Sequence, residues 1–275
     1  MKPLQRSILG VFCGGILLCS PACADEVKPG LDVLVFVDET GSTTRQFDMY
    51  RHALLDKIVP NLHGGDRLRV VPITADNSMV VDYMAEGALN AKPPFDSLSD
   101  NEIEYKSSVK KIEADNAAVR HDLLVKLRGV LAKPGSSRYT DLFGATHFAA
   151  QVFSADKNRP VVVFLSDMQE DRGRFRYKDM KWNARDLARV KRIYGFPDLK
   201  NVCVYVVGLR SPSIQKTREM RVFWENYFKQ SQADIAKAHM TSMLVDWPPP
   251  DGCGSPRVVH KREGWFKHMT RQLGF

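Results

Sequence analysis

Residues Leu31–Ser42 read LDVLVFVDETGS and contain the two features from which the fold is predicted. The first seven residues are apolar, and mostly β-branched or aromatic, with Asp32 as the only break. A run of this kind is typical of a strand buried on both faces, as in a parallel sheet. The run ends abruptly in Asp38–Ser42, and a helical pattern follows from about Thr43. The stretch therefore predicts an α/β protein with a polar cluster at the carboxyl end of a buried strand.

That polar cluster carries oxygen atoms at alternate positions, on Asp38, Thr40 and Ser42. Ligands of open α/β sheets bind outside the carboxyl ends of the strands. Carboxylate and hydroxyl oxygens suit Mg²⁺, which takes near-octahedral geometry and keeps several waters. The same residue types also form ordinary turns and helix N-caps. Taken alone, the cluster is compatible with a metal site and with a cap.

Two later segments repeat the pattern of a polar residue at the end of an element. Thr140 precedes a helical pattern in Ser137–Phe153, SRYTDLFGATHFAAQVF, and Asp167 ends a second apolar run, Arg159–Asp167, RPVVVFLSD. This order of D-x-T-x-S, T-D and S-D resembles the von Willebrand factor type A domain and its metal-ion-dependent adhesion site, over roughly residues 31–244. The matching residues are Asp38, Thr40, Ser42, Thr140 and Asp167. Many members of the family carry Ser in place of Thr40, and the hydroxyl is kept.

The resemblance implies a doubly wound, mostly parallel central sheet flanked by helices, with one antiparallel edge strand. We expect that edge in the strand-like pair Arg67–Thr74 and Met79–Tyr83. The resemblance also implies that the five residues hold Mg²⁺ or Mn²⁺. An ion held largely by neutral hydroxyls and water stays electrophilic, so a partner protein can offer it an Asp or Glu carboxylate. Glu39 is expected to point away from the ion, because side chains alternate along an extended segment.

The first 24 residues are expected to be a secretory signal. Lys2 and Arg6 form its positive end, Ile8–Leu18 its short apolar run and Ala22–Ala24 its cleavage site. An uncleaved membrane anchor and a lipoprotein are the alternatives. The expected location is the periplasm, with secretion or membrane anchoring as the other possibilities.

The rest of the chain is expected to form one domain and a tail. Residues 25–247 are predicted to be the von Willebrand factor type A-like domain, with a helical insertion at about 84–135. Pro248–Pro250 mark a boundary, and residues 248–275 are predicted to be a Pro/Gly-rich linker with a basic amphipathic tail.

Export changes the interpretation of the five cysteines. Cys13, Cys19 and Cys23 lie in the predicted signal, which leaves Cys203 in an apolar run and Cys253 in a Pro/Gly-rich loop. Disulfides persist in exported proteins. We therefore expect either a Cys203–Cys253 disulfide or a buried free thiol at Cys203.

A basic segment follows Asp167. The chain has a formal net charge of +8, or +6 without Lys2 and Arg6 of the signal. Four cations are expected to border the site and to form an anionic-partner surface: Arg172, Arg174, Arg176 and Lys178. Aromatic residues interleave with them, as in surfaces that bind nucleic acid, but we expect no nucleic-acid partner for an exported protein. The alternative is a solvated loop and helix.

The predicted function is an exported, metal-dependent protein-binding module of the adhesion or scaffold type. One alternative is a scaffold whose site binds no functional metal. A second is a metal-dependent hydrolase, because an open metal position can activate water. A haloacid-dehalogenase type phosphatase needs an acid where Thr40 stands, and neither metalloprotease His spacing nor a Gly-rich phosphate loop occurs. The chain is therefore predicted not to be an enzyme.

Overall fold

The computed structural model describes residues 29–74, 77, 82–133, 135, 137, 139–154 and 158–255. The predicted signal segment and residues 256–275 of the predicted tail lie outside these described residues. No helix in the described part of the chain combines the length and the apolar content needed to cross a membrane.

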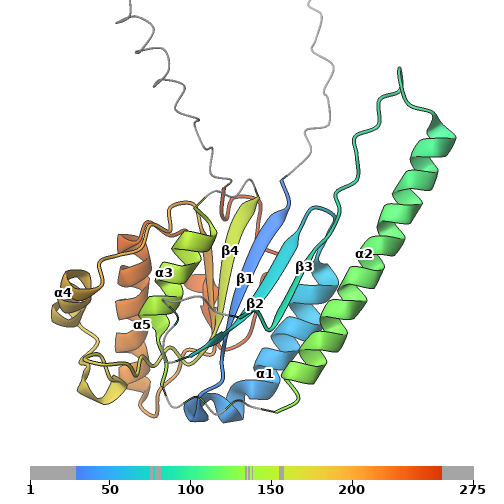
Figure 1. Cartoon of the computed structure of the whole chain (residues 1–275). Coiled ribbons are helices and arrows are strands. Elements are labelled where there is room, and N and C mark those ends of the chain that lie inside the picture. Colours follow the sequence, from blue (N-terminus) through green and yellow to red (C-terminus); the bar gives the residue numbers. More distant parts are fainter. Residues whose placement is uncertain are drawn as a thin grey trace, which may run out of the picture.

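A six-stranded sheet forms the centre of the molecule (Figure 1). The strand order is β3-β2-β1-β4-β5-β6, and every neighbouring pair is parallel except β2 and β3. This confirms the predicted doubly wound, mostly parallel sheet with one antiparallel edge strand. The strands are β1 Leu31–Asp38, β2 Arg67–Ile73, β3 Ala85–Ala88, β4 Arg159–Leu165, β5 Cys203–Val207 and β6 Met240–Thr241.

The antiparallel edge lies later in the chain than the sequence pattern predicted. Met79–Tyr83 was expected to form it, but the strand is β3, residues 85–88, which pairs with β2. Residues 82 and 83 are not strand, and residues 79–81 lie outside the described part. The cause is close packing, because a Cβ on Gly87 would lie 3.0 Å from Leu123 of helix α2, Glu102–Val130. The strand needs small residues there, so it lacks the usual β-branched signature.

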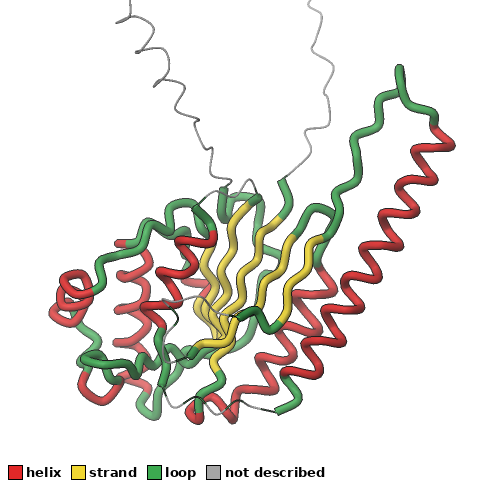
Figure 2. The backbone as a smooth tube through the Cα atoms, viewed as in Figure 1, coloured by secondary structure: helices red, strands yellow, loops and turns green. Residues whose placement is uncertain are grey.

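Helices cover both faces of the sheet, as Figure 2 shows. Helices α1 and α2 contribute to the core cluster on one face, and α3, α4 and α5 to the cluster on the other. The segment between β1 and β2 is helical over residues 41–61, as a 3₁₀ turn, α1, a π-helical turn and another 3₁₀ turn. The helices are α1 Phe47–His52, α2 Glu102–Val130, α3 Leu142–Val152, α4 Ala184–Ile193 and α5 Ile214–Gln230.

Strand β1 is buried on both faces, as its sequence predicted. Val33, Val35 and Val37 pack with α1 and α2, while Leu34 and Phe36 pack in the cluster of α3 and α5. This alternation follows from the two-residue period of a strand. The chain leaves β1 toward β2 on one side and later returns as β4 on the other side. The end of β1 is therefore a topological switch point, where ligands of such sheets bind.

A disulfide joins Cys203, at the start of β5, to Cys253, with 5.2 Å between the Cα atoms. It brings the loop of residues 248–255 back to the amino end of the sheet. Of the two expected alternatives, a Cys203–Cys253 disulfide and a buried free thiol, the structure has the disulfide.

Candidate metal centre

Three segments meet at the carboxyl ends of β1 and β4. They are the turn that follows β1, the residues before α3 and the turn that follows β4. Thr40, Ser42 and Thr140 line one cavity of about 340 Å³. Asp38 and Asp167 lie close enough for the charge of Asp38 to raise the pKa of Asp167. The structure therefore places all five predicted residues at one end of the sheet.

Asp38 is the last residue of β1, and its side chain is fully buried. Its Oδ1 atom accepts hydrogen bonds from the Thr40 backbone N–H at 3.0 Å and from the Thr40 hydroxyl at 2.6 Å. Its Oδ2 atom accepts a hydrogen bond from the Ser166 hydroxyl at 2.6 Å. Burial raises the pKa of Asp38, and the bonds from Ser166 and Thr40 oppose that shift. The carboxylate is therefore held in one orientation.

The hydroxyls of Thr40 and Ser42 lie 3.1 Å apart. Thr40 is buried and Ser42 is exposed, so the pair leads from the protein interior to the surface. The turn that carries them is fixed by Thr43, whose hydroxyl lies 2.8 Å from the Asp38 carbonyl oxygen and 2.9 Å from that of Thr40. The D-x-T-x-S spacing thus brings a carboxylate and two hydroxyls together, as the sequence predicted.

Asp167 follows β4 and is 2% exposed. Its Oδ1 atom accepts a hydrogen bond from the Gln169 backbone N–H at 3.0 Å, and its side chain is hydrogen-bonded to Ser42. Burial, and then the nearby charge of Asp38, raise its pKa to about 7, although Ser42 and Arg210 act against the shift. Two buried carboxylates thus lie near enough to repel each other, and a bound cation would offset that repulsion.

Thr140 is 3% exposed, and its carbonyl oxygen accepts a hydrogen bond from the Asp171 backbone N–H at 3.1 Å. The next residue, Asp141, is the N-cap of α3 and accepts from Gly144 N–H at 2.8 Å. It also forms an ion pair with Arg172. Asp141 therefore holds the turn that presents Thr140, and its own carboxylate is occupied.

Sequence reasoning missed two supporting residues. Ser166 binds the Asp38 carboxylate, and its hydroxyl also accepts from the Met168 backbone N–H at 2.9 Å. Glu170 is fully buried and accepts from the Leu142 N–H at 2.7 Å, which caps α3. Burial raises the pKa of Glu170 well above its usual range. Ser166 stands beside Asp167 in the S-D pair and could have been found, whereas Glu170 lies in a run that resembles a solvated loop.

The predicted basic surface is only partly at the site. Arg176 and Lys178 line the cavity together with Tyr139 and Tyr177. Arg172 instead turns inward to Asp141. The predicted mixing of aromatic and basic side chains is also only partial, because Phe175 and Trp182 are 1% and 2% exposed and belong to the core. Their spacing in the sequence did not distinguish core residues from surface residues.

A second group of ligand-type side chains lies elsewhere in the molecule. Atoms of Cys203, His239 and Cys253 lie within 4.8 Å of one another and are buried. The two sulfurs are bonded to each other, so neither is a thiolate ligand in this structure. The three side chains are therefore part of the core beside β5 and do not form a metal site.

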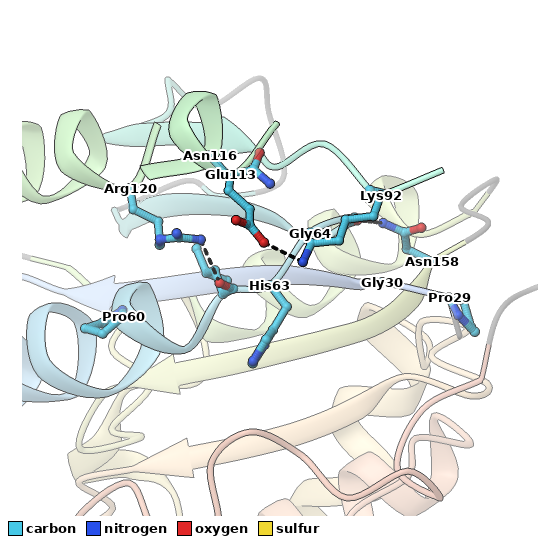
Figure 3. A pocket seen from close by; sticks show the side chains of 13 residues that line it. Pro29, Gly30, Pro60, His63, Gly64, Lys92, Glu113, Asn116, Arg120 and Asn158 are labelled. Atoms are coloured by element: carbon cyan, nitrogen blue, oxygen red, sulfur yellow. Dashed lines mark hydrogen bonds and ion pairs between the residues drawn. The ribbon is translucent and has the colours of Figure 1, made fainter. Parts of the chain in front are cut away.

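A cavity of about 750 Å³ lies at the opposite end of the sheet (Figure 3). Its wall includes Gly30, which precedes β1, and Asn158, which precedes β4. Lys92 and Glu113 form an ion pair across it at 2.6 Å. None of the predicted site residues lines this cavity.

No family model and no curated protein sequence matches the chain. Among solved structures, proximal thread matrix protein 1 from the mussel byssus is 10% identical, covers 74% of this chain and 46% of its own, and has a TM-score of 0.38. A von Willebrand factor type A protein from Catenulispora acidiphila is 13% identical over 74% and 42%, with a TM-score of 0.37. The pilus adhesin SpaC from Lactobacillus rhamnosus GG is 14% identical over 73% and 27%, with a TM-score of 0.40.

The chain thus spans less than half the length of each of these proteins. At these identities and scores, the likenesses carry no argument about activity or partners. The sheet order and the polar cluster after β1 and β4 are observed in this structure and do not depend on those likenesses. On those two features, the molecule resembles a von Willebrand factor type A domain with the residues of a metal-ion-dependent adhesion site.

Proposed function

We propose that this chain is an exported binding module that uses a divalent cation to bind a carboxylate of a partner protein. The observation that carries the proposal is the set of five oxygen-bearing side chains around the end of β1 and β4. Three of them are neutral hydroxyls, and two are buried carboxylates. No single segment supplies them, so the fold is what assembles them.

The donor set fits Mg²⁺ or Mn²⁺. Both ions prefer oxygen ligands, and the five residues offer no sulfur or imidazole. Neighbouring ligands of an octahedral ion with bonds of about 2.1 Å lie about 3.0 Å apart. The Thr40 and Ser42 hydroxyl oxygens are 3.1 Å apart, which suits two adjacent positions on one ion. Thr140 would supply a third hydroxyl, while Asp38 and Asp167 would act directly or through waters.

Binding of a partner follows from the charge left on such an ion. Hydroxyls and waters neutralise little of the charge of a divalent cation, so the ion attracts an anionic oxygen at an open position. Arg176 and Lys178 line the same cavity as the hydroxyls and outnumber its one acid, Asp171, so the charges there also favour an acidic partner. Tyr139 is 52% exposed at the same edge and offers apolar contact.

Calorimetric titration of Mg²⁺ and Mn²⁺ into residues 25–275, which include every described element, tests the proposal. We expect one-to-one binding that is lost in Ser42→Ala and in Thr140→Val, a near-isosteric change for a buried residue. Thr44→Ala is the matched control, because the exposed Thr44 hydroxyl only bonds to the Gly41 carbonyl in the same turn. Equal binding by all four proteins would overturn the assignment of the ligands.

If a partner's carboxylate completes the metal site, the protein can bind the metal only weakly in the absence of that partner. The titration is therefore repeated in acetate, which supplies a carboxylate. Absence of binding with and without acetate would favour a scaffold that uses no metal. Metal-dependent turnover of generic phosphate or ester substrates would favour a hydrolase. Metal binding that strengthens in acetate, with no turnover, is the result expected for a carboxylate-binding module.

A further inference from the structure

An arm projects from the body of the molecule, as Figures 1 and 2 show. It consists of residues 91–115, which include an extended segment and the first half of α2. Side chains of α2 are mostly exposed before Asn116, whereas Asn116, Leu123 and Leu127 are buried against the body. The arm therefore presents its end to solvent instead of packing on the core.

The base of the arm is fixed to the body (Figure 3). The Asn116 side-chain amide donates to the Asn90 carbonyl at 2.9 Å and accepts from the Asn90 N–H at 2.8 Å. Arg120 donates to the Leu62 carbonyl at 3.2 Å. With the Lys92–Glu113 ion pair, these contacts give the arm a defined direction relative to the sheet.

The end of the arm, residues 93–106, is called the tip. It exposes apolar side chains, with Leu98 at 96%, Ile103 at 80% and Phe95 at 45% of their surface. The loop beneath them is ordered by Asp96, whose carboxylate accepts from Leu98 N–H and the Ser99 hydroxyl, both at 2.9 Å. A structured loop that holds large apolar side chains in water is typical of an interaction surface.

The tip is acidic although the chain is basic. Residues 93–106 hold four acids and one lysine, in a chain of formal net charge +8. The cavity at the candidate metal centre is lined by two cations, Arg176 and Lys178, and by one acid, Asp171, so its rim carries a surplus of positive charge. The two surfaces are therefore complementary in charge, and the rim also offers Tyr139 and Tyr177 to the apolar side chains of the tip.

The tip and the metal centre lie at opposite ends of the molecule (Figure 1). The tip extends beyond the amino ends of the strands, whereas Asp38 stands at the carboxyl end of β1. A contact between them must therefore join two copies. We infer that the partner of this site is the tip of a second copy of this chain, in a head-to-tail contact. This inference rests on the function proposed above and names its partner.

One carboxylate of the tip is suited to reach the ion. Both oxygens of Asp96 accept hydrogen bonds from its own loop, and Asp100 accepts from the Asp96 N–H at 2.7 Å. Glu102 pairs with Lys106 at 2.6 Å. Glu104 is exposed, and its carboxylate has no hydrogen bond or ion pair to any residue in the described part of the chain. Glu104 is therefore the carboxylate that fills the open position.

Sedimentation velocity of residues 25–275 over a range of concentrations, in Mg²⁺ or in EDTA, tests the inference. The wild type is expected to form larger species in Mg²⁺ and to be monomeric in EDTA. Glu104→Gln, which removes the charge and keeps the shape, should stay monomeric in both. Asp115→Asn is the matched control on the exposed face of the same helix, and it should associate like the wild type.

A mixing experiment separates the two surfaces. Glu104→Gln keeps the metal centre and Thr140→Val keeps the tip, so each variant alone should be monomeric and their mixture should form dimers only.

A monomeric wild type that binds metal by calorimetry would overturn the inference and leave the proposed function standing. Failure of metal binding itself would instead remove the proposed function. Association that survives EDTA or Glu104→Gln, or Leu98-dependent binding to phosphatidylcholine vesicles without self-association, would also overturn the inference.

Discussion

The Ser166 hydroxyl donates a hydrogen bond to the Asp38 Oδ2 atom at 2.6 Å and so connects the end of β4 to the end of β1. Both residues are fully buried. The bond fixes the carboxylate that the metal would need, although Ser166 itself is not among the expected ligands. Because the bond joins residues at the ends of two neighbouring strands, the position of the Asp38 carboxylate depends on the spacing between β1 and β4.

Replacement of Ser166 by Ala should weaken metal binding. A hydrogen bond to a charged group contributes about 1.5–3 kcal/mol, so we expect a loss of about tenfold or more in affinity. Calorimetry with Mn²⁺ measures it. Ser154→Ala is the control, because within the described residues the exposed Ser154 hydroxyl bonds only to the Gln151 carbonyl. Equal affinity in Ser166→Ala and the wild type would show that Asp38 needs no orientation from β4.

Metal binding should be sensitive to pH near neutrality. The pKa of Asp167 is raised to about 7 by burial and by Asp38. A proton therefore competes with the cation, and metal affinity should fall as the pH drops through about 7. Titrations between pH 8 and pH 5.5 measure this, and Asp167→Asn should abolish both the binding and its pH dependence. An affinity that is constant over this range would contradict a ligand role for Asp167.

The metal-free protein should show the opposite trend in stability. Asp167 binds a proton more tightly when folded than when unfolded, because its pKa rises from 3.8 to about 7. Its contribution to the free energy of unfolding therefore increases as the pH falls from above 7 toward 4, by on the order of 4 kcal/mol at the limit. Urea unfolding in EDTA at pH 8 and pH 5 checks this. Asp167→Asn should be more stable than the wild type at pH 8 and should lack this increment.

Reduction of the disulfide should destabilise the fold without changing the site. The Cys203–Cys253 bond closes a loop with a sequence separation of 50, which corresponds to about 4 kcal/mol in the chain-entropy model. Thermal unfolding of Cys253→Ser against the wild type measures the loss. Metal affinity should be unchanged, because Cys203 begins β5 at the end of the sheet away from Asp38. A large loss of metal affinity in a variant that remains folded would contradict this separation.

Gly87→Ala should loosen the contact between β3 and α2. The new Cβ would lie 3.0 Å from Leu123, and overpacking of this kind costs about 1–3 kcal/mol. Gly129→Ala on α2 is the control, because no atom outside the helix turn lies within 4 Å of its added Cβ. That change should stabilise the helix by up to about 1 kcal/mol. Equal unfolding midpoints for the two variants would show that α2 does not press on β3.

The sequence predicted the parts of the structure that depend on local pattern. The apolar run of β1 predicted a strand that is buried on both faces. The hydroxyl and carboxylate side chains that follow it were predicted to lie at the edge of the sheet where the parallel strands end. The order of the three motifs along the chain then identified the fold class. These features could be predicted because each of them depends on residues that are close together in the sequence.

Other features depend on contacts between distant segments and have no local signature. Strand β3 has a glycine at residue 87 where Leu123 of α2 packs on it. Glu170 resembles a surface acid but caps α3 from within the core. Phe175 and Trp182 stand among cations in the sequence and pack in the core cluster of α3 and α5. Each of these positions is decided by its tertiary neighbour.

Strands β1 and β4 lie side by side in parallel, with Leu31–Val37 opposite Arg159–Leu165. A force applied to an ion bound by Asp38 and Asp167 would act along β1 and β4 at the same time. The backbone hydrogen bonds that join them to their neighbours would then be loaded in shear, so they would resist together instead of opening one after another. The same arrangement that gathers the ligands would therefore let the site carry mechanical tension, with β2 and β5 sharing the load on either side.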